Sequence, residues 1–428
     1  MKTKKLTGDV NCDVLVIGAG MAGLLCAYEI SRQGADCIVC EAECAGGGVS
    51  GSTTGKVTAQ HGLCYASLLE NIGKEGARAY LYSNLEAVER LRSLCSENDA
   101  LWEEVPSFVY SEKDRQKLEN EHLALKQLGY DAPIQEKLPL PFPTSGGICF
   151  PRQGQIDAPE LMEKLAAKLD IYEHTPVRKV SPGKACTDNA VIHADSIIIA
   201  THFPFIIRYG LYFLKMYQER SWFVAAENCQ DVGGMYIGEG GGLSFRNMGN
   251  TLYVGGAAAR TGKKSRAWES AEELISRCYP NAKIKYKWAT QDCITLDGMP
   301  YIGRYSKAVP GLYVATGFNK WGMTGSMLSA MILSDTVNGR KNEYESLYSP
   351  HRSVLKKRAV TNLGETLSGL ISFKRPRCPH MGCALQWNPH ENSWDCPCHG
   401  SRFDADGELI IGPAKRDMNA AADNSRYK

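Results

Sequence analysis

The chain has 428 residues, 43% of them hydrophobic and 22% charged, with a formal net charge of +2. This length exceeds what one compact core usually holds, so we expect at least two domains. The small net charge argues against a nucleic acid or an acidic membrane as partner, and no apolar run reaches the length of a membrane-spanning helix. Because no secretory signal is visible, we expect a cytoplasmic protein without a transmembrane segment.

The first 41 residues have the pattern of a strand, a helix and a second strand. The apolar run at 12–17 predicts a buried parallel strand, the apolar spacing over 22–32 predicts a helix, and residues 35–40 predict the next strand. This unit is the building block of a Rossmann-like α/β domain.

The turn between the first strand and the helix carries a glycine motif at 18–23. Gly18 permits a tight turn, Gly20 lets the backbone approach a pyrophosphate, and Gly23 lets helix and strand pack closely. Glu41 ends the second strand, where its carboxylate can accept hydrogen bonds from ribose hydroxyls. The motif therefore predicts a dinucleotide site, although the pattern by itself does not separate FAD from NAD.

The rest of the chain alternates between helical and extended patterns, without an internal repeat. In chain order, the patterns predict mostly helix at 75–127, loops and short strands at 133–151, a helix at 158–169, a strand at 196–200, mainly extended structure at 222–286, a strand at 312–315, a helix at 321–337 and a polar, partly helical connector at 340–374.

The chain contains 16 cysteines, and their distribution is uneven. Twelve lie within 12–293 without recurring spacing, and we expect them to pack as small hydrophobes. Near the C-terminus, Cys378 with His380 and Cys396 with His399 give C-x-H followed by C-x-x-H. This is the ligand pattern of a Rieske centre, in which two thiolates hold one iron and two imidazoles hold the other. A zinc site with the same four ligands is the alternative.

Several later segments resemble the amino-acid-oxidase family of flavoproteins, which includes D-amino-acid, glycine and sarcosine oxidases. The similarity extends over 13–350 and is carried in order by the segments 51–56, 154–157, 175–177, 295–303, 311–318 and 319–324. The resemblance implies a glutathione-reductase or DAO type of α/β fold, in which a Rossmann-like FAD-binding domain is interleaved with an antiparallel β-sheet substrate domain. We expect the FAD to be bound non-covalently, because nothing specific supports Cys293 as a residue of flavin attachment.

The same resemblance indicates which residues contact FAD. They come from the glycine turn, the end of the second strand, the loop at 51–56 and the later segments. The expected contacts are Gly18, Gly20, Met21, Ala22, Gly23, Glu41, Thr53, Thr54, Gly55, Lys56, Val177, Thr316, Gly317, Lys320, Gly322, Met323 and Thr324. At 319–324, a helix N-terminus and backbone N–H groups would stabilise negative charge on the reduced flavin.

The segments 378–383 and 396–401 resemble the Rieske proteins of cytochrome bc complexes. The resemblance implies a disulfide between Cys383 and Cys398 that ties the two ligand loops together. The strands that precede the first ligand loop in complete Rieske domains have no counterpart here, so we expect a truncated cluster-binding subdomain. A segment this small should need the cluster, the disulfide and docking against the flavin domain.

These patterns divide the chain into an FAD-dependent oxidoreductase domain at 1–350, a connector at 351–374, a Rieske cluster-binding domain at 375–418 and a disordered tail at 419–428.

We expect an enzyme that oxidises an amine or amino-acid-like substrate and exchanges electrons one at a time with an external carrier through the Rieske cluster. Arg246 is the candidate clamp for a substrate carboxylate, with a structural role equally open. The alternatives are a reductase fed by an external ferredoxin-like donor and a non-catalytic, redox-sensing flavoprotein. The sequence does not set the substrate, the direction of electron flow or the oligomeric state.

Overall fold

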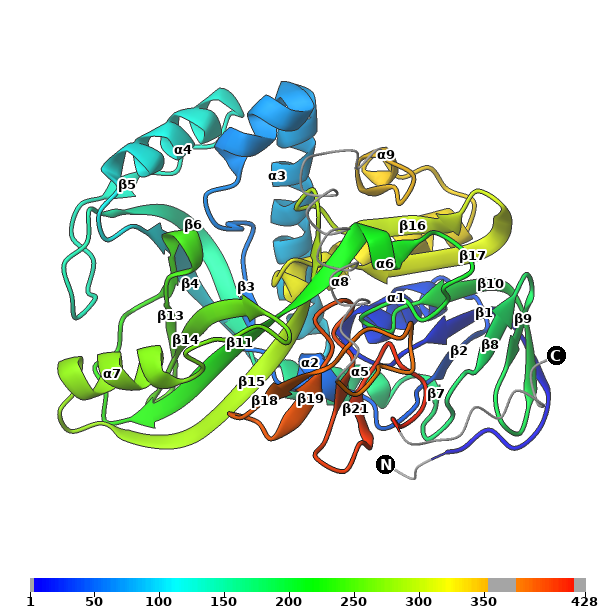
Figure 1. Cartoon of the computed structure of the whole chain (residues 1–428). Coiled ribbons are helices and arrows are strands. Elements are labelled where there is room, and N and C mark those ends of the chain that lie inside the picture. Colours follow the sequence, from blue (N-terminus) through cyan, green and yellow to red (C-terminus); the bar gives the residue numbers. More distant parts are fainter. Residues whose placement is uncertain (1–3, 353–374, 419–428) are drawn as a thin grey trace.

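The structure, a computed structural model, describes residues 4–352 and 375–418. In these two ranges the strands form two large sheets and one small sheet near the C-terminal end (Figure 1). Except for its first two residues, the predicted connector at 351–374 lies outside the described residues, as does the predicted tail at 419–428.

The first sheet has a parallel centre, as the strand–helix–strand pattern predicts. In spatial order it consists of β16 (Tyr301–Ser306), β17 (Val309–Thr316), β10 (Val191–Ile199), β1 (Val10–Ile17), β2 (Cys37–Cys40) and β7 (Asp170–Tyr172), while β9 (Lys184–Cys186) pairs with β10 and with β8 (Lys179–Ser181). β1 runs parallel to β10 and β2, and β10 runs parallel to β17. The last four residues of β1 are buried, as is typical of a strand covered on both faces.

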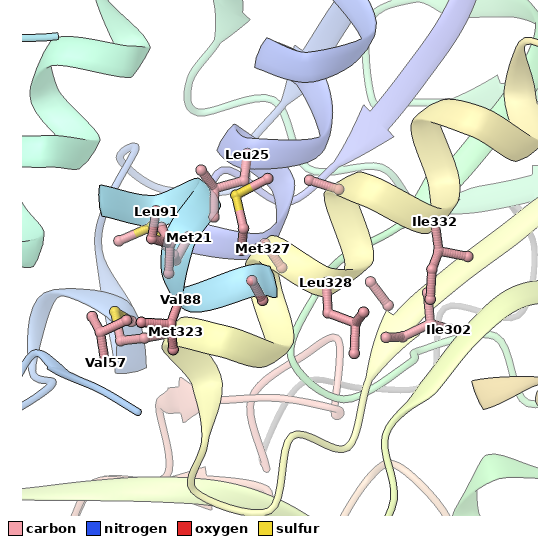
Figure 2. Close-up of a cluster of buried hydrophobic side chains, with 14 of the residues drawn as sticks. Met21, Leu25, Val57, Val88, Leu91, Ile302, Met323, Met327, Leu328 and Ile332 are labelled. Carbon is pink, nitrogen blue, oxygen red and sulfur yellow. The ribbon is translucent and has the colours of Figure 1, made fainter. Parts of the chain in front are cut away.

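Two helices that follow strands of this sheet pack against each other, with a third across them. α1 (Met21–Ser31) follows β1, α8 (Gly322–Val337) follows β17, and α3 (Tyr65–Glu97) contacts both. Figure 2 shows buried side chains at this junction, including Leu25 of α1 and Met327 of α8. Because most residues of α1 and α8 are buried, their N-termini are held firmly at the edge of the sheet.

The second sheet is largely antiparallel and lies beside the first (Figure 1). In spatial order it consists of β15 (Lys283–Thr295), β11 (Met216–Glu227), β14 (Thr251–Arg260), β13 (Ser244–Met248), β12 (Met235–Gly238), β4 (Trp102–Tyr110), β6 (Gly147–Ile156) and β3 (Lys56–Val57), with β5 (Ile134–Gln135) paired to β6. Only β12 and β4 run parallel among the pairs described in this sheet. The predicted combination of an α/β domain with an interleaved antiparallel sheet is confirmed.

The described residues form further helices besides α1, α3 and α8. They are α2 (Gly48–Gly51), α4 (Arg115–Gln127), α5 (Ala158–Ala166), α6 (Tyr212–Lys215), the 3₁₀ helix η1 (Glu239–Gly241), α7 (Glu269–Cys278) and α9 (Glu345–Tyr348). None of the helices in the described ranges is both long enough and apolar enough to cross a lipid bilayer.

Two predicted stretches differ from the structure. The stretch at 75–127 contains β4 between α3 and α4, and the extended stretch at 222–286 contains α7. The aromatic and β-branched residues of β4 favour a strand, but the adjacent Glu103 and Glu104 are both exposed and interrupt the alternation that would reveal it.

The third sheet belongs to the C-terminal segment and packs against β11. It is antiparallel and consists of β18 (Gln386–Asn388), β19 (Ser393–Asp395), β20 (Arg402–Phe403) and β21 (Leu409–Ile411). Arg220 of β11 is 3% exposed, and its Nε donates to Glu391 Oε2 over 2.7 Å. Arg402 also pairs with Glu391, over 3.1 Å, and with Asp395, over 2.8 Å. This buried ion network fixes the small sheet on the large one.

We predict that Glu391→Leu destabilises the docked segment by about 3–5 kcal/mol, because it leaves the buried Arg220 without its carboxylate. Combining it with Arg220→Met should recover most of the loss, since replacing both charges removes the desolvation cost. Thermal unfolding and limited proteolysis of the holoprotein measure the effect. Glu408→Leu, at an exposed position of the same segment, is the control, and an equal loss there would contradict the prediction.

Candidate cofactor sites and substrate cavity

The turn between β1 and α1 lies where a doubly wound sheet binds ligands, at the carboxyl ends of the parallel strands. The N-cap of α1 is Gly20, which has no side chain to cap the helix. The first N–H groups of an α-helix have no partner within the helix, and the helix dipole favours an anion there. The turn is therefore suited to a phosphate group.

The two glycines at the start of α1 differ in what surrounds them. A Cβ atom added at Gly23 would lie 1.8 Å from the carbonyl oxygen of Gly18, so the packing of helix on strand requires glycine there. A Cβ atom at Gly20 would meet only the hydroxyl of Ser50, at 2.9 Å. Gly20 therefore leaves space over the turn rather than within the core, which fits the expected approach of a pyrophosphate.

Glu41 holds its carboxylate beside this turn. One of its oxygens accepts a hydrogen bond from the backbone N–H of Ala19 at 2.7 Å, and the other accepts from Glu43 N–H at 2.9 Å. The N–H of Thr175 donates to the Glu41 carbonyl at 2.8 Å, which brings the segment that contains Val177 to the end of β2. The predicted adenosine-side contacts therefore come together at one edge of the sheet.

A cavity of about 670 Å³ lies between the second sheet and the start of α8. Its walls include residues of β11, β13 and β14, and also six of the predicted FAD contacts. These six are Thr53, Thr54, Lys56, Lys320, Gly322 and Met323. The structure therefore brings the loop at 51–56 and the segment at 319–324 to one site, although they lie far apart in the sequence.

Gly55, Thr316, Gly317 and Thr324, four further predicted contacts, are buried and do not themselves line the cavity. Thr316 ends β17 and donates its hydroxyl to the carbonyl of His202 at 2.5 Å, and Gly317 follows it with a φ of +74°. The Thr324 hydroxyl lies 3.0 Å from His61 Nε2. Gly55 is held under β6, because its carbonyl accepts from Ile156 N–H at 3.0 Å.

His61 is a site residue that sequence reasoning missed. Its ring stacks on Trp321 with centroids 4.7 Å apart, and its Nδ1 lies 2.7 Å from the hydroxyl of Tyr80. Burial lowers the pKa of His61 to about 3, so the ring is neutral and fixes the start of α8 through hydrogen bonds. A lone histidine has no spacing pattern, so the sequence offered no signal for this role.

Arg246 and Lys56 occupy the same region but different depths. Arg246 is 3% exposed, donates to Gln155 Oε1 at 3.3 Å and stacks over the ring of Tyr253. It is not among the residues that line the cavity, whereas Lys56 is. These contacts favour the structural interpretation of Arg246 over its predicted role as a substrate clamp.

Lys56 directs its ammonium group toward hydroxyl groups rather than toward a carboxylate. Its Nζ lies 3.4 Å from Thr54 Oγ1 and 3.4 Å from Ser244 Oγ, both long hydrogen bonds. Burial, together with the charge of Arg246, lowers the pKa of Lys56 to about 7. An anion in the cavity would therefore find a cation whose hydrogen-bonding capacity is poorly used.

The predicted Rieske ligands lie on two loops with the same backbone pattern. In the first loop, Cys378 N–H donates to the Cys383 carbonyl at 2.9 Å and Gly382 N–H donates to the Cys378 carbonyl at 2.8 Å. In the second, Cys396 bonds Ser401 at 2.8 Å and Gly400 bonds Cys396 at 2.9 Å in the same way. Each loop thus presents one cysteine and one histidine from a closed turn.

The two imidazoles meet edge to face, with centroids 5.0 Å apart. The Nδ1 atoms of His380 and His399 are buried without a hydrogen-bond partner among the described residues. Burial lowers the pKa of His380 to about 4 and that of His399 to about 3, so both rings are neutral, the form that binds a metal. Orphaned nitrogens beside the buried Cys378 and Cys396 fit a group with two imidazole and two thiolate ligands.

The expected disulfide is not formed in this structure. The sulfur atoms of Cys383 and Cys398 lie within 4.8 Å of each other, but Cys396 Sγ lies within the same distance of both. The three sulfurs thus share one small space between the loops, and the pairing of Cys383 with Cys398 stays a prediction.

We predict that Gly20→Ala and Gly23→Ala separate cofactor binding from folding. Gly20→Ala should lose FAD while the apoprotein keeps its thermal stability, because the new methyl group displaces only a serine side chain and occupies the approach to the phosphates. Gly23→Ala should lower the stability of the apoprotein itself, because the added methyl group overlaps the backbone. Flavin absorbance and thermal unfolding of the apoproteins distinguish them, and a fully flavinated Gly20→Ala protein would contradict the assignment.

Comparison with known proteins agrees with this geometry. The family model described as FAD dependent oxidoreductase matches residues 13–336, and the model described as Rieske 2Fe-2S domain matches residues 354–422. The expected cofactors, FAD and a Rieske-type 2Fe-2S cluster, are confirmed for the two domains, while the individual contact residues stay predictions.

Known proteins resemble the flavin part and the Rieske part of the chain, either together or separately. A putative Rieske 2Fe-2S iron-sulfur protein of Bacillus subtilis (strain 168), YhfW, is 30% identical over 473 residues, which cover 96% of this chain and 93% of that protein. The cytochrome b6-f complex iron-sulfur subunit 1 of Nostoc sp. (strain PCC 7120) is 49% identical over 41 residues, or 10% of this chain and 23% of that protein. Glycine oxidase from Geobacillus kaustophilus has a similar fold, with a TM-score of 0.68 and 20% identity over 80% of this chain and 99% of that one. The chain therefore belongs to the FAD-dependent oxidoreductases of the DAO family and carries a C-terminal Rieske 2Fe-2S domain.

Proposed function

We propose that this chain oxidises an amine or amino-acid-like substrate in the cavity and exchanges electrons one at a time with an external carrier through its Rieske domain. The observation that carries the proposal is the contact of the second ligand loop with β11, a strand that also lines the cavity. Proteins of similar fold include a glycine oxidase, an L-proline dehydrogenase from P. horikoshii and an L-amino acid deaminase from Proteus vulgaris, which supports a substrate of this class.

The electrons of the proposed reaction balance when a two-electron carrier and a one-electron carrier act in sequence. A C–H bond next to the substrate nitrogen breaks, and the amine loses two electrons and two protons to become an imine. FAD supplies two-electron chemistry and a Rieske cluster supplies one-electron chemistry. Two molecules of an external one-electron acceptor are therefore reduced for each amine oxidised.

The cavity residues position the substrate rather than act as an obligatory base. We assign Lys56 to the substrate carboxylate, because its ammonium group lines the cavity and makes only long hydrogen bonds. Hydroxyl groups of Thr54 and Ser244 beside it can accept or donate further hydrogen bonds. Orientation of the reacting carbon is then the main contribution of the protein.

We place the enzyme in the cytoplasm. Eleven of the twelve cysteines in the first part of the chain are buried or half-buried and pack as small apolar side chains, which is compatible with a reducing compartment.

The reaction direction is tested by anaerobic titration of holoprotein purified under argon, after iron, sulfide and flavin have been assayed. We predict that a panel of amines and amino acids bleaches the flavin absorbance and that added ferricyanide restores it. Reduction by a ferredoxin-type donor alone would instead indicate a reductase. Cluster reduction without any small-molecule substrate would indicate a redox sensor.

The proposed role of Lys56 in holding a carboxylate can be tested by measuring how anion binding depends on pH. The folded-state pKa of Lys56 lies below its unfolded-state pKa, so this group lowers the free energy of unfolding. The loss is complete below a pH of about 7 and disappears above the unfolded-state pKa. A bound carboxylate offsets that cost. We predict that benzoate, followed by flavin absorbance, binds more tightly as the pH falls toward about 7 and that its affinity changes little below that pH, where Lys56 is already protonated.

Lys56→Met should weaken benzoate binding about tenfold below neutral pH and remove the pH dependence, since it removes one charged hydrogen-bond donor. Lys117→Met is the matched control, because Lys117 stands at the exposed rim of the same cavity. Unchanged binding in Lys56→Met, or equal loss in the control, would contradict the assignment.

A further inference from the structure

Two buried glutamines lie between the second ligand loop and the flavin-binding part of the chain. Gln218 of β11 donates from Nε2 to the carbonyl oxygen of His399 at 2.6 Å. Gln291 of β15 donates from Nε2 to the carbonyl oxygen of Gly400 at 2.7 Å. Gln218 is 1% exposed and Gln291 is 0% exposed, so water does not compete for these bonds. Each glutamine thus holds one peptide group of the loop that carries the ligands Cys396 and His399.

The surroundings fix the orientation of both amide groups. Gln218 Oε1 accepts from Gln291 Nε2 at 2.6 Å and lies 3.2 Å from His202 Nε2, while Gln291 Oε1 accepts from the Thr261 hydroxyl at 3.2 Å. Each oxygen faces donors, so each NH₂ group must face the loop. The amides therefore cannot flip without losing several hydrogen bonds at once.

The same hydrogen-bond chain continues toward the flavin site. Burial lowers the pKa of His202 to about 4, so the neutral ring can donate to Gln218. The carbonyl oxygen of His202 accepts from the Thr316 hydroxyl at the end of β17, one of the predicted FAD contacts. A series of polar contacts through His202 and Gln218 therefore connects Thr316 to the backbone of the cluster ligand His399.

The loop is shaped to receive Gln218. A Cβ atom at Gly400 would lie 2.6 Å from Gln218 Cδ, so a larger residue there would push the amide away. The His399 ring packs against Phe203 and Phe213 of the flavin-binding part, with centroids 6.2 and 5.9 Å away. Of the two ligand histidines, His399 is therefore the one that faces this part of the chain.

We propose that Gln218 and Gln291 are positioning residues that hold the His399 loop in register with the flavin site and couple the two redox centres electronically. The proposal rests on the proposed function, because it assumes that single electrons pass between the centres. Neither residue is a metal ligand or a substrate contact. Their task is to fix the geometry across which a single electron moves, so that one centre is oxidised by one electron as the other is reduced.

The test replaces each glutamine by methionine, which keeps length and approximate volume but removes the amide. The holoproteins Gln218→Met and Gln291→Met are compared with wild type by iron content, by EPR of the dithionite-reduced cluster, and by the rate at which the cluster is reduced after anaerobic photoreduction of the flavin. Glu408→Gln is the control, because it alters an exposed side chain of the same segment that lies outside both ligand loops.

We expect both methionine variants to slow the arrival of the electron by about tenfold, the rate equivalent of one lost buried hydrogen bond. Their EPR g-values should shift, while the rate of flavin photoreduction stays at the wild-type value. The control should match wild type in all three measurements. Wild-type transfer rates and g-values in both methionine variants would overturn the proposal, as would equal slowing in Glu408→Gln.

Two further outcomes remain decisive. If a methionine variant loses iron, Thr261→Val carries the test, since it removes only the hydroxyl that orients Gln291, and an unchanged transfer rate there would refute the proposal. If wild-type protein passes no electron between its centres, the proposed function fails and the coupling role fails with it. The EPR comparison then still decides whether the glutamines hold the ligand loop.

Discussion

The architecture depends on the polar contacts between β11 and the cluster-binding segment, which are buried away from water. The small sheet has little apolar core of its own, and four of the seven buried members of its hydrophobic cluster are cysteines. A unit of this size needs a bound group or a partner surface to remain folded. Buried hydrogen bonds from Gln218 and Gln291, and the ion network around Glu391, supply that surface.

This mode of docking also decides which side of the cluster site is available to other molecules. His399 is fully buried against aromatic side chains of the flavin-binding part, whereas His380 is partly exposed. The external carrier that we propose would therefore reach the cluster from the His380 side. Entry and exit of electrons would then use different sides of the cluster, which suits the proposed coupling of a two-electron reaction to one-electron partners.

Local patterns were sufficient to predict the chemistry of each site but not the contact between the sites. The glycine turn, Glu41 and the four Rieske ligands depend on spacing within one turn or loop, and spacing is what a sequence displays. β4 was missed because two adjacent glutamates conceal its alternation. Gln218 and Gln291 could not be found, because an isolated glutamine has no pattern and its role arises only when strands from distant parts of the chain meet the ligand loop.

The roles of Arg246 and Lys56 likewise could not be assigned from the sequence, because they depend on how deeply each cation is buried. Both are cations close to the loop at 51–56, and an arginine is the more usual partner for a carboxylate because its fork binds two oxygens. In this structure the guanidinium is packed against Gln155 and Tyr253 and is not part of the cavity wall, whereas Lys56 is, and our proposal for Lys56 rests on this difference. The charge of Arg246 helps to keep the pKa of Lys56 low, which makes the ammonium form costly until an anion arrives. A site arranged in this way would favour a carboxylate over a neutral ligand, because only an anion offsets the cost of holding the buried ammonium group protonated.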